Sequence, residues 1–212
     1  MTRPDMALIA SRLGVSQSAP TIRDQRNSER AMRYAISTSD LVLRYPYQFS
    51  TSIQVDVYTD SDWADELHRR SRSGILIFFN NQLVHWKTNI QTTVQPSSTA
   101  AEIVAASEGI LELRYLVMLL DDLSLAPDRI ILHLDNKAAI ATIKDPISPK
   151  RTKHLDVRHK LIRQHFEQKF FELDWVPSDQ NPADALTKMP SQHLFERHRY
   201  FMFHGRYPSE SI

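Results

Sequence analysis

The chain has 212 residues, of which 42% are hydrophobic and 24% charged, as is typical of a soluble globular protein of one large domain or one domain with an appendage. The formal net charge is only +1, so no overall field draws the chain to nucleic acid. The absence of cysteine excludes disulfides, zinc–thiolate sites and cysteine nucleophiles, and four glycines are too few for a phosphate-cradling glycine loop.

Residues 1–50 are rich in arginine and are predicted to form an N-terminal helical connection segment. Apolar residues recur with helical spacing around residues 7–13 and 26–36, and Pro20 and Pro46 interrupt the pattern. We therefore expect two short helices and a linker, in which no catalytic chemistry is visible.

Alternating apolar residues predict the first strand, over residues 53–59. Asp60 is then expected where this strand ends, and sites in open α/β sheets gather at the carboxyl ends of strands. Asp60 and Asp62 are equally well explained as turn residues, because aspartate favours turns. On this stretch alone, the turn interpretation is favoured.

A hairpin is predicted next. The polar residues 64–73 indicate a connecting loop, and two β-rich runs, 74–79 and 83–86, flank the turn signal Asn80-Asn81. The first three strands are therefore expected to form an antiparallel meander.

A long helix with one buried face follows the meander. Thr99 and Glu102 match a Thr-x-x-Glu capping box, which would give Glu102 a purely structural role. The small residues Ala105, Ala106 and Gly109 lie on the same side as Glu102 and would let the helix approach a sheet closely.

The rest of the chain alternates between strands and helices. Residues 130–134 predict a buried strand and 137–143 a helix, while 155–169 predict a helix and 170–176 a fifth strand. A loop, a short helix carrying Asp184 and a helical tail complete the chain. We expect an α/β fold whose five-stranded mixed sheet is antiparallel for strands 1-2-3 and parallel for strands 1-4-5.

Four carboxylates converge in this arrangement. If the first and fourth strands are parallel neighbours, Asp60 and Asp135 end side by side, about 4.8 Å apart. Glu102 comes from the long helix and Asp184 from the short one. Such oxygen ligands suit Mg²⁺ or Mn²⁺, and a divalent ion would relieve the repulsion between them. Two ions about 4 Å apart can stabilise both the attacking and the leaving oxygen of a phosphodiester displacement.

The amino-acid sequence of these segments resembles the RNase H domain of copia-type LTR retrotransposon polyproteins, and the predicted arrangement of strands and helices resembles the RNase H fold. The matching strings are Tyr-Thr-Asp-Ser-Asp-Trp-Ala (58–64), Ser-Ser-Thr-Ala-Ala-Glu (97–102), Asp-Asn-Lys-Ala-Ala-Ile (135–140), Arg-Thr-Lys-His-Leu-Asp-Val-Arg (151–158) and Ala-Asp-Ala-Leu-Thr-Lys (183–188). The resemblance implies an RNase H-like domain over residues 51–190, preceded by the connection segment and followed by a tail, 191–212.

The resemblance also implies roles for the carboxylates. Asp60, Glu102, Asp135 and Asp184 would be the catalytic residues and the ligands of two Mg²⁺ or Mn²⁺ ions, and the reaction would be hydrolysis of the RNA in an RNA–DNA hybrid. The sequence departs from the family at three positions, none of them an implied metal ligand: Asp65 replaces glycine, Ala100 replaces glutamate and Ile103 replaces an aromatic residue.

The implied partners are the RNA–DNA hybrid and the reverse transcriptase portion of the same polyprotein. No stretch approaches the roughly 18 apolar residues of a membrane span, and the first five residues lack the apolar core of a signal peptide. No membrane partner is therefore expected. An intracellular setting is compatible with the sequence and is expected, in the cytoplasm, in virus-like particles or in the nucleus.

A basic segment, residues 144–163, holds seven Lys and Arg and is the candidate hybrid-binding surface. Its proposed contacts are Arg151, Lys153, His154, Arg158 and Lys160. Cellular RNases H carry a histidine before the last carboxylate, whereas the loop 177–182 has none, so the proton-transfer role stays unassigned. His154 is a candidate for it, although a phosphate contact or local packing is favoured. A solvated face is the alternative explanation of the basic segment.

Two other functions compete with a metal-dependent endoribonuclease. One is a non-catalytic nucleic-acid-binding or scaffold protein derived from the same domain. The other is a different RNase H-like enzyme, such as an integrase or an exonuclease. The intact carboxylates argue against the first alternative and the five strings against the second.

Overall fold

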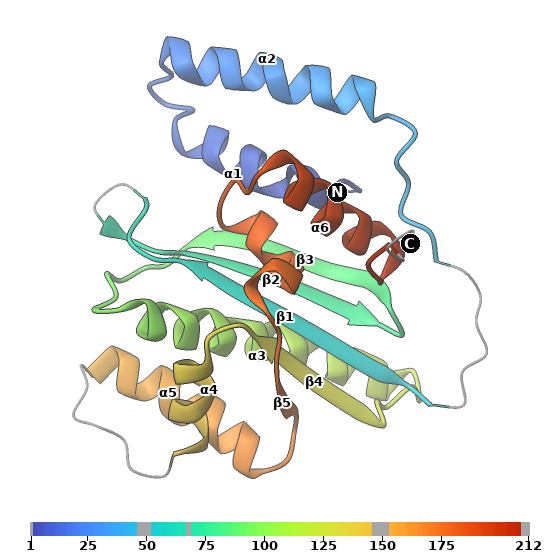
Figure 1. The fold of residues 1–212 in the computed structure, drawn as a ribbon. Coiled ribbons are helices and arrows are strands. Elements are labelled where there is room, and N and C mark those ends of the chain that lie inside the picture. The colour runs from blue at the N-terminus through green and yellow to red at the C-terminus, as the bar shows by residue number, and fades with distance from the viewer. Residues whose placement is uncertain (1, 46–51, 67–68, 146–152, 209–212) are drawn as a thin grey trace.

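The computed structural model describes residues 2–45, 52–66, 69–145 and 153–208. At its centre is a five-stranded mixed sheet in the order β3-β2-β1-β4-β5 (Figure 1). The pairs β1–β2 and β2–β3 are antiparallel, whereas β1–β4 and β4–β5 are parallel. The strands are β1 (Gln54–Asp62), β2 (Arg72–Phe79), β3 (Gln82–Ile90), β4 (Arg129–Leu134) and β5 (Glu172–Trp175). The structure thus confirms the predicted RNase H-like α/β fold class.

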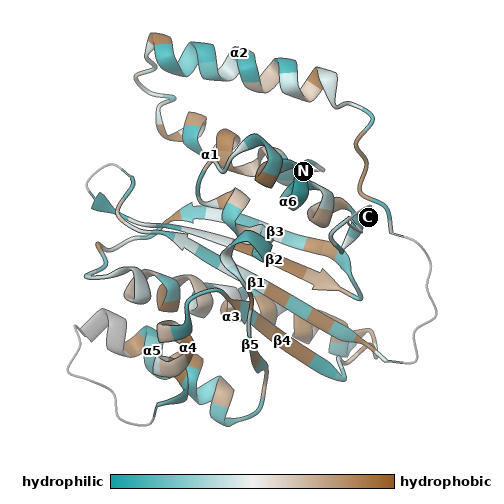
Figure 2. Ribbon diagram, viewed as in Figure 1, coloured by the Kyte–Doolittle hydropathy of each residue, from teal (hydrophilic) through white to brown (hydrophobic). Residues whose placement is uncertain are grey.

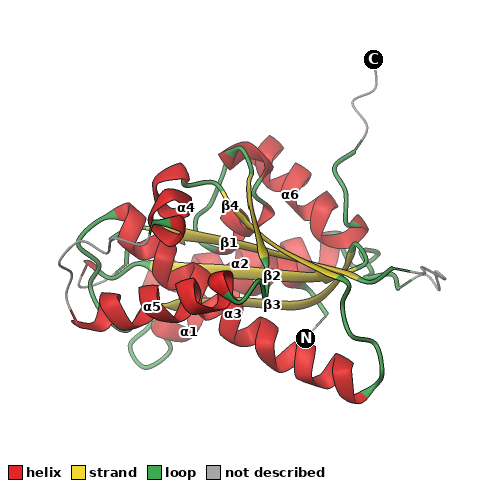
Figure 3. Ribbon diagram, turned by 90° about the horizontal axis from the view of Figure 1, so that it is seen from below, coloured by secondary structure: helices red, strands yellow, loops and turns green. Residues whose placement is uncertain are grey.

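Helices lie on both sides of this sheet (Figures 1 and 3). In the described residues the α-helices are α1 (Ala7–Val15), α2 (Ile22–Ser37), α3 (Ser98–Asp122), α4 (Lys137–Lys144), α5 (Lys153–Glu167) and α6 (Gln192–His204). Short 3-10 helices are η1 (Pro4–Met6), η3 (Ser178–Gln180) and η4 (Pro182–Leu186). In Figure 1, α3, α4 and α5 lie on one side, and α1, α2 and α6 on the other.

Each face of the sheet has its own hydrophobic core, because successive side chains of a strand point to opposite faces. Val57 and Ile77 belong to a core that includes the buried residues of α3 and α4. Leu76 and Phe78 belong to a second core, which includes Met202 of α6. The apolar strands, brown in Figure 2, are therefore covered on both faces.

Two glycines permit close contacts between the sheet and the elements α3 and η4. A Cβ on Gly109 of α3 would lie 2.7 Å from Cγ2 of Thr59, and a Cβ on Gly74 of β2 would lie 2.8 Å from the carbonyl oxygen of Ala183. The predicted close approach of the long helix is thus confirmed at Gly109. The backbones of α3 and η4 can approach β1 and β2 this closely only where no side chain intervenes.

The first strand is longer than predicted, so the expectation that Asp60 follows the strand is wrong. Pairing with β4 ends at Tyr58, opposite His133, but pairing with β2 continues to Asp62, opposite Arg72. Asp60 therefore lies just beyond the parallel part of β1 and is still held by the antiparallel part. Pairing with Gly74 of β2 thus places the backbone of Asp60 in a strand and not in a turn.

Arg72 likewise belongs to β2, and not to the loop predicted over residues 64–73. Its side chain is fully buried, with Nε 2.5 Å from Oε1 of Glu66. Its Nη1 donates hydrogen bonds to Oγ of Ser11 in α1, at 2.8 Å, and to Oγ1 of Thr88, at 3.1 Å. A charged side chain is typical of a loop in the sequence, but these partners of Nε and Nη1 compensate part of the cost of its burial, while Nη2 has no hydrogen-bond partner in the described residues.

The capping box predicted for Thr99 and Glu102 is also wrong. The N-cap of α3 is Ser97, whose side chain accepts a hydrogen bond from the backbone N–H of Ala100, at 3.1 Å. Thr99 lies inside the first turn, and Glu102 is too far along the helix to reach the N-cap. Glu102 is therefore free of the structural role that the capping box would have given it.

The connection segment packs against the rest of the chain through α1, which Arg72 ties to β2. The domain boundary predicted at residue 50 lies outside the described residues, and the division into three parts stays a prediction. None of the described helices combines the length and the apolar character that a membrane crossing requires.

Candidate active site

The register of the parallel strands brings Asp60 and Asp135 together. Tyr58 pairs with His133, so two residues further along each chain come Asp60 and Asp135. Asp60 is still within β1, whereas Asp135 immediately follows the end of β4. The sequence-based expectation that these two carboxylates lie side by side agrees with this register.

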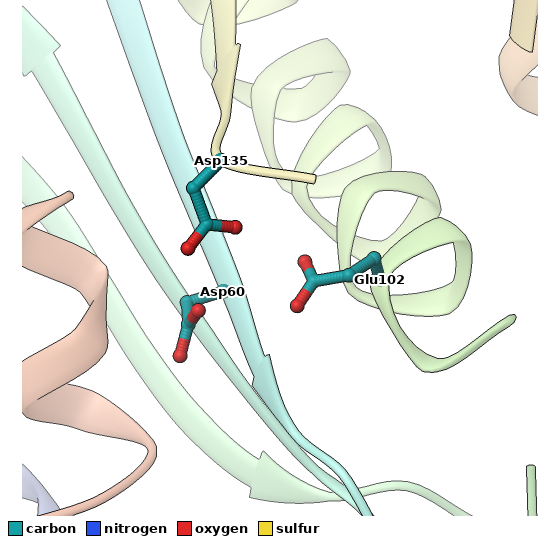
Figure 4. Close-up of side chains that lie close together, drawn as sticks. All are labelled: Asp60, Glu102 and Asp135. Carbon is teal, nitrogen blue, oxygen red and sulfur yellow. The ribbon is translucent and has the colours of Figure 1, made fainter. Parts of the chain in front are cut away.

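Glu102 reaches the same place from α3 (Figure 4). Its Oε1 accepts two hydrogen bonds from Ser61, one from the backbone N–H at 3.1 Å and one from Oγ at 2.9 Å. Its Oε2 is buried and has no hydrogen-bond partner among the described residues. One oxygen of Glu102 is thus fixed by the protein, and the other remains available to a ligand.

Asp60, Glu102 and Asp135 form a group that we call the carboxylate triad. One oxygen from each lies within 4.8 Å of the others, and the three side chains converge in Figure 4. Asp60 is 2% exposed and Glu102 is 5% exposed. Burial raises the pKa of Asp60 to about 7, and the nearby carboxylates add to that rise. Burial, reinforced by Asp60 and Asp135, also raises the pKa of Glu102 well above its ordinary value.

Asp184, the fourth predicted carboxylate, lies in η4 and is buried. It is not in the carboxylate triad, and its Oδ1 pairs with Nζ of Lys188. Its Oδ2 is buried without a hydrogen-bond partner in the described part of the chain. Burial raises the pKa of Asp184, and Lys188 opposes that rise. The structure therefore brings three of the four predicted carboxylates together in the carboxylate triad and leaves Asp184 outside it.

Sequence reasoning missed several side chains that organise this site. Thr187 donates a hydrogen bond from Oγ1 to Oδ2 of Asp60, and Lys188 pairs with Asp184. Asn181 donates from Nδ2 to the carbonyl oxygen of Thr59, at 2.9 Å. Thr187 and Lys188 lie three and four residues after Asp184, a spacing that places side chains on one side of a helical turn and could have indicated their proximity.

The basic segment is only partly described. Arg151 lies outside the described residues, and the side chains of Lys153 and His154 are not described either, although both residues begin α5. Arg158 is half-buried, with Nη2 3.8 Å from Oε1 of Glu108 in α3. Lys160 is exposed. The role of all five residues in binding stays a prediction.

The carboxylate triad fits a divalent cation. Its donors are all carboxylate oxygens, the ligands that Mg²⁺ and Mn²⁺ prefer, and it contains a buried oxygen without a partner in the described residues. Three carboxylates this close repel one another unless a positive charge or a proton lies among them. The geometry is therefore compatible with metal binding.

Sequence comparison identifies the relatives of the chain. Over 140 residues, 66% of the chain, it is 34% identical to the retrovirus-related Pol polyprotein from transposon TNT 1-94 of Nicotiana tabacum. Over 199 residues, 92% of the chain, it is 26% identical to those from transposons RE1 and RE2 of Arabidopsis thaliana. The chain is a homologue of copia-type retrotransposon Pol polyproteins. The recognition made from the five strings is thereby confirmed.

This Pol homologue spans 10% of the tobacco polyprotein and 13% of each Arabidopsis one. It is also 34% identical over 119 residues to the secreted RxLR effector protein 161 of Plasmopara viticola, covering 82% of that protein. No protein-family model matches the chain.

Solved structures similar to the Pol homologue include RNase H1 enzymes and a retroviral RNase H domain. LC11-RNase H1, isolated from compost, aligns with 65% of this chain and 94% of its own, at 18% identity and a TM-score of 0.48. The RNase H domain of prototype foamy virus aligns with 70% of this chain and 96% of its own, at 13% identity and a TM-score of 0.42.

Proposed function

We propose that this chain is the RNase H domain of a retrotransposon Pol polyprotein and that it cleaves the RNA strand of RNA–DNA hybrids endonucleolytically during reverse transcription. The observation that carries the proposal is the carboxylate triad, built by the β1–β4 register and by the close approach of α3. Homology to copia-type Pol polyproteins supports it.

Two Mg²⁺ or Mn²⁺ ions are the proposed cofactors. Asp60, Glu102 and Asp135 would hold them together with Asp184, whose buried Oδ2 has no partner in the described residues. When bound, the ions would stabilise negative charge on the attacking and leaving oxygens of the phosphodiester. The number of ions and the fourth ligand belong to the proposal.

The surrounding residues of the chain orient these carboxylates. Thr187 donates to one oxygen of Asp60, and Ser61 donates twice to one oxygen of Glu102. One oxygen of each carboxylate is thereby fixed by a hydrogen bond from the protein. Such fixed hydrogen bonds limit the reorganisation that a site needs when charge develops.

The proposed partner is an RNA–DNA hybrid, which the basic segment would hold by its phosphates. LC11-RNase H1 has been solved in complex with an RNA/DNA hybrid, and the foamy viral protease-reverse transcriptase has been solved with one as well. By the same proposal, this chain acts beside the reverse transcriptase portion of its polyprotein and at an intracellular location.

The test is cleavage of a labelled RNA–DNA hybrid with Mg²⁺, with Mn²⁺ and with EDTA. We expect internal cuts in the RNA strand with either metal and none with EDTA. RNA–RNA and DNA–DNA duplexes of the same sequence should stay intact. Asp135→Asn, purified in parallel, controls for a contaminating host nuclease.

Cleavage that persists in EDTA or in Asp135→Asn would overturn the proposed mechanism. Salt-dependent binding of the hybrid without cleavage in either metal would instead support the alternative, a non-catalytic nucleic-acid-binding protein.

A further inference from the structure

Lys188 places an ammonium group inside the carboxylate site. Its Nζ pairs with Oδ1 of Asp184, four residues earlier, and its side chain is 45% exposed whereas that of Asp184 is 3% exposed. The contact therefore joins a buried carboxylate to a lysine that still reaches solvent. An ordinary i,i+4 pair on a helix surface differs from this one, because both of its partners are in water and their attraction is weak.

The charge of Lys188 also acts on the rest of the site. Burial alone would lower the pKa of Lys188, but Asp60, Asp184 and Asp135 together hold it above its ordinary value. In the other direction, Lys188 lowers the pKa of both Asp60 and Asp184 against the effect of burial. The ammonium thus contacts Asp184 of η4 directly and acts through its charge on Asp60 and Asp135.

Asp184 lies outside the carboxylate triad and pairs with Lys188 instead. Oδ1 of Asp184 is occupied by the ammonium, and Oδ2 is buried with no partner in the described part of the chain. A metal ion bound to Oδ2 would share this carboxylate with the ammonium on Oδ1, and the two positive charges would repel each other.

We propose that Lys188 is a positioning residue that serves as a built-in counter-cation of the site, and that a divalent ion at Asp184 must either bind against the repulsion of this ammonium or displace it. The inference rests on the proposed function, because it takes Asp184 as the fourth ligand. Its consequence is that divalent ions fill the site in two stages, first at the carboxylate triad and then, more weakly, at Asp184.

A displaced ammonium can move into a neighbouring cavity. Lys188 borders this cavity, which has a volume of about 660 Å³ and lies between α1, α2, η4 and α6. Asn27 and Glu196 line this cavity and can accept hydrogen bonds from an ammonium group, whereas Arg30 and Arg199, which also line it, would repel one. Because the Lys188 side chain is 45% exposed, water can also hydrate a displaced ammonium.

The experiment is titration of the full chain with Mn²⁺ alone, followed by calorimetry and by thermal unfolding, so that no nuclease assay is involved. Wild type is compared with Lys188→Met and with the charge-preserving Lys188→Arg. The matched control is Lys87→Met, because the Lys87 side chain is 40% exposed and pairs with Glu112, away from the site. We expect Lys188→Met to bind the second Mn²⁺ about tenfold more tightly than wild type, a typical size for such coupling.

The same variant should lose thermal stability without metal and gain more than wild type when Mn²⁺ is added. Lys188→Arg and Lys87→Met should titrate like wild type. If Lys188→Met unfolds without metal, Lys188→Gln, which keeps a hydrogen-bond donor for Asp184, takes its place in the comparison.

Second-site affinity that is unchanged or weaker in Lys188→Met, or in Lys188→Gln where that variant replaces it, would overturn the inference and leave the proposed function standing, provided that wild type binds Mn²⁺. If neither wild type nor the uncharged variant binds Mn²⁺, the metal site fails, and the proposed function and the inference fail with it.

Discussion

The side chain of Asn181 donates a hydrogen bond from Nδ2 to the carbonyl oxygen of Thr59, at 2.9 Å, although 122 residues separate the two in sequence. Oδ1 of Asn181 meanwhile accepts from the backbone N–H of Ala183, at 3.2 Å. One buried amide thus joins the residue before Asp60 to the turn that carries Asp184. It thereby fixes the position of η4 relative to β1.

We expect Asn181→Ala to destabilise the protein by about 1–3 kcal/mol, because the carbonyl oxygen of Thr59 would lose this buried donor. Cleavage should fall as well, since η4 would no longer be fixed to β1. Denaturant unfolding and the hybrid assay measure the two effects. The neighbouring exposed residue gives a control, Gln180→Ala, which should stay within about 0.5 kcal/mol of wild type. Equal stability of the two variants would contradict this role for Asn181.

The contact between α3 and β1 predicts opposite effects for two glycine substitutions. In Gly109→Ala the new methyl group would meet Thr59, and we expect a loss of about 1–3 kcal/mol together with lower cleavage, because Glu102 would move with the helix. Gly14 in α1 has no atom within 4 Å of an added Cβ. Gly14→Ala should therefore be neutral or stabilise by up to about 1 kcal/mol. Thermal unfolding of both variants decides whether close packing at Gly109 is the cause.

Asp60→Asn and Asp135→Asn should each lower cleavage by orders of magnitude while the fold persists, because each keeps the shape and removes a charge from the proposed metal site. Circular dichroism and the hybrid assay with Mg²⁺ measure the two properties. A near-normal rate in either variant would show that the substituted residue is structural.

The pH dependence of stability gives a second readout for Asp60. Its pKa is raised to about 7 in the folded protein from an ordinary value of 3.8, so folding favours the protonated form. The contribution of this group to stability is therefore greatest below about pH 4 and is lost as the pH rises towards about 7. In EDTA, the melting temperature of wild type should fall more between about pH 5 and pH 8 than that of Asp60→Asn. Parallel pH profiles would contradict the buried position of Asp60.

Glu102→Gln separates the catalytic role of Glu102 from a structural one. The amide oxygen of Gln can still accept from Ser61, and the change removes one of three repelling charges. In the absence of metal, we expect stability at neutral pH to stay constant or increase, while cleavage with Mg²⁺ is lost. Unfolding curves in EDTA and the hybrid assay test this. A less stable variant that still cleaves would show that Glu102 supports the fold and not the chemistry.

The hybrid-binding role of the basic segment is tested by the salt dependence of affinity. Arg151→Ala with Lys153→Ala should weaken binding to hybrids of every sequence and flatten the slope of log K against log salt by up to about two. Cleavage at saturating hybrid should largely persist. The matched variant is Arg23→Ala with Arg26→Ala, which removes the same charge from exposed positions of α2. If only this second pair changes the slope, the duplex contact belongs to the N-terminal arginines.

Local patterns in the sequence were sufficient to predict the fold. Alternation at period two predicted strands such as β1, and apolar spacing predicted the long helix α3, because burial of one face of an element repeats with that element's own period. The order of strands and helices then left few topologies, and the parallel pairing of β1 with β4 placed Asp60 beside Asp135. The five strings identified the family.

Only the tertiary structure decided which side chains pair with one another in the site. The pairing of Lys188 with Asp184, the hydrogen bond from Thr187 to Asp60 and the two from Ser61 to Glu102 depend on which side chains meet after packing. The same is true of the N-cap of α3, where Ser97 and Thr99 compete for one role and backbone geometry selects Ser97. A side chain's partner across more than a hundred residues, such as Thr59 for Asn181, has no periodic signature in the sequence, because it depends on how η4 packs against the sheet, which it meets closely at Gly74.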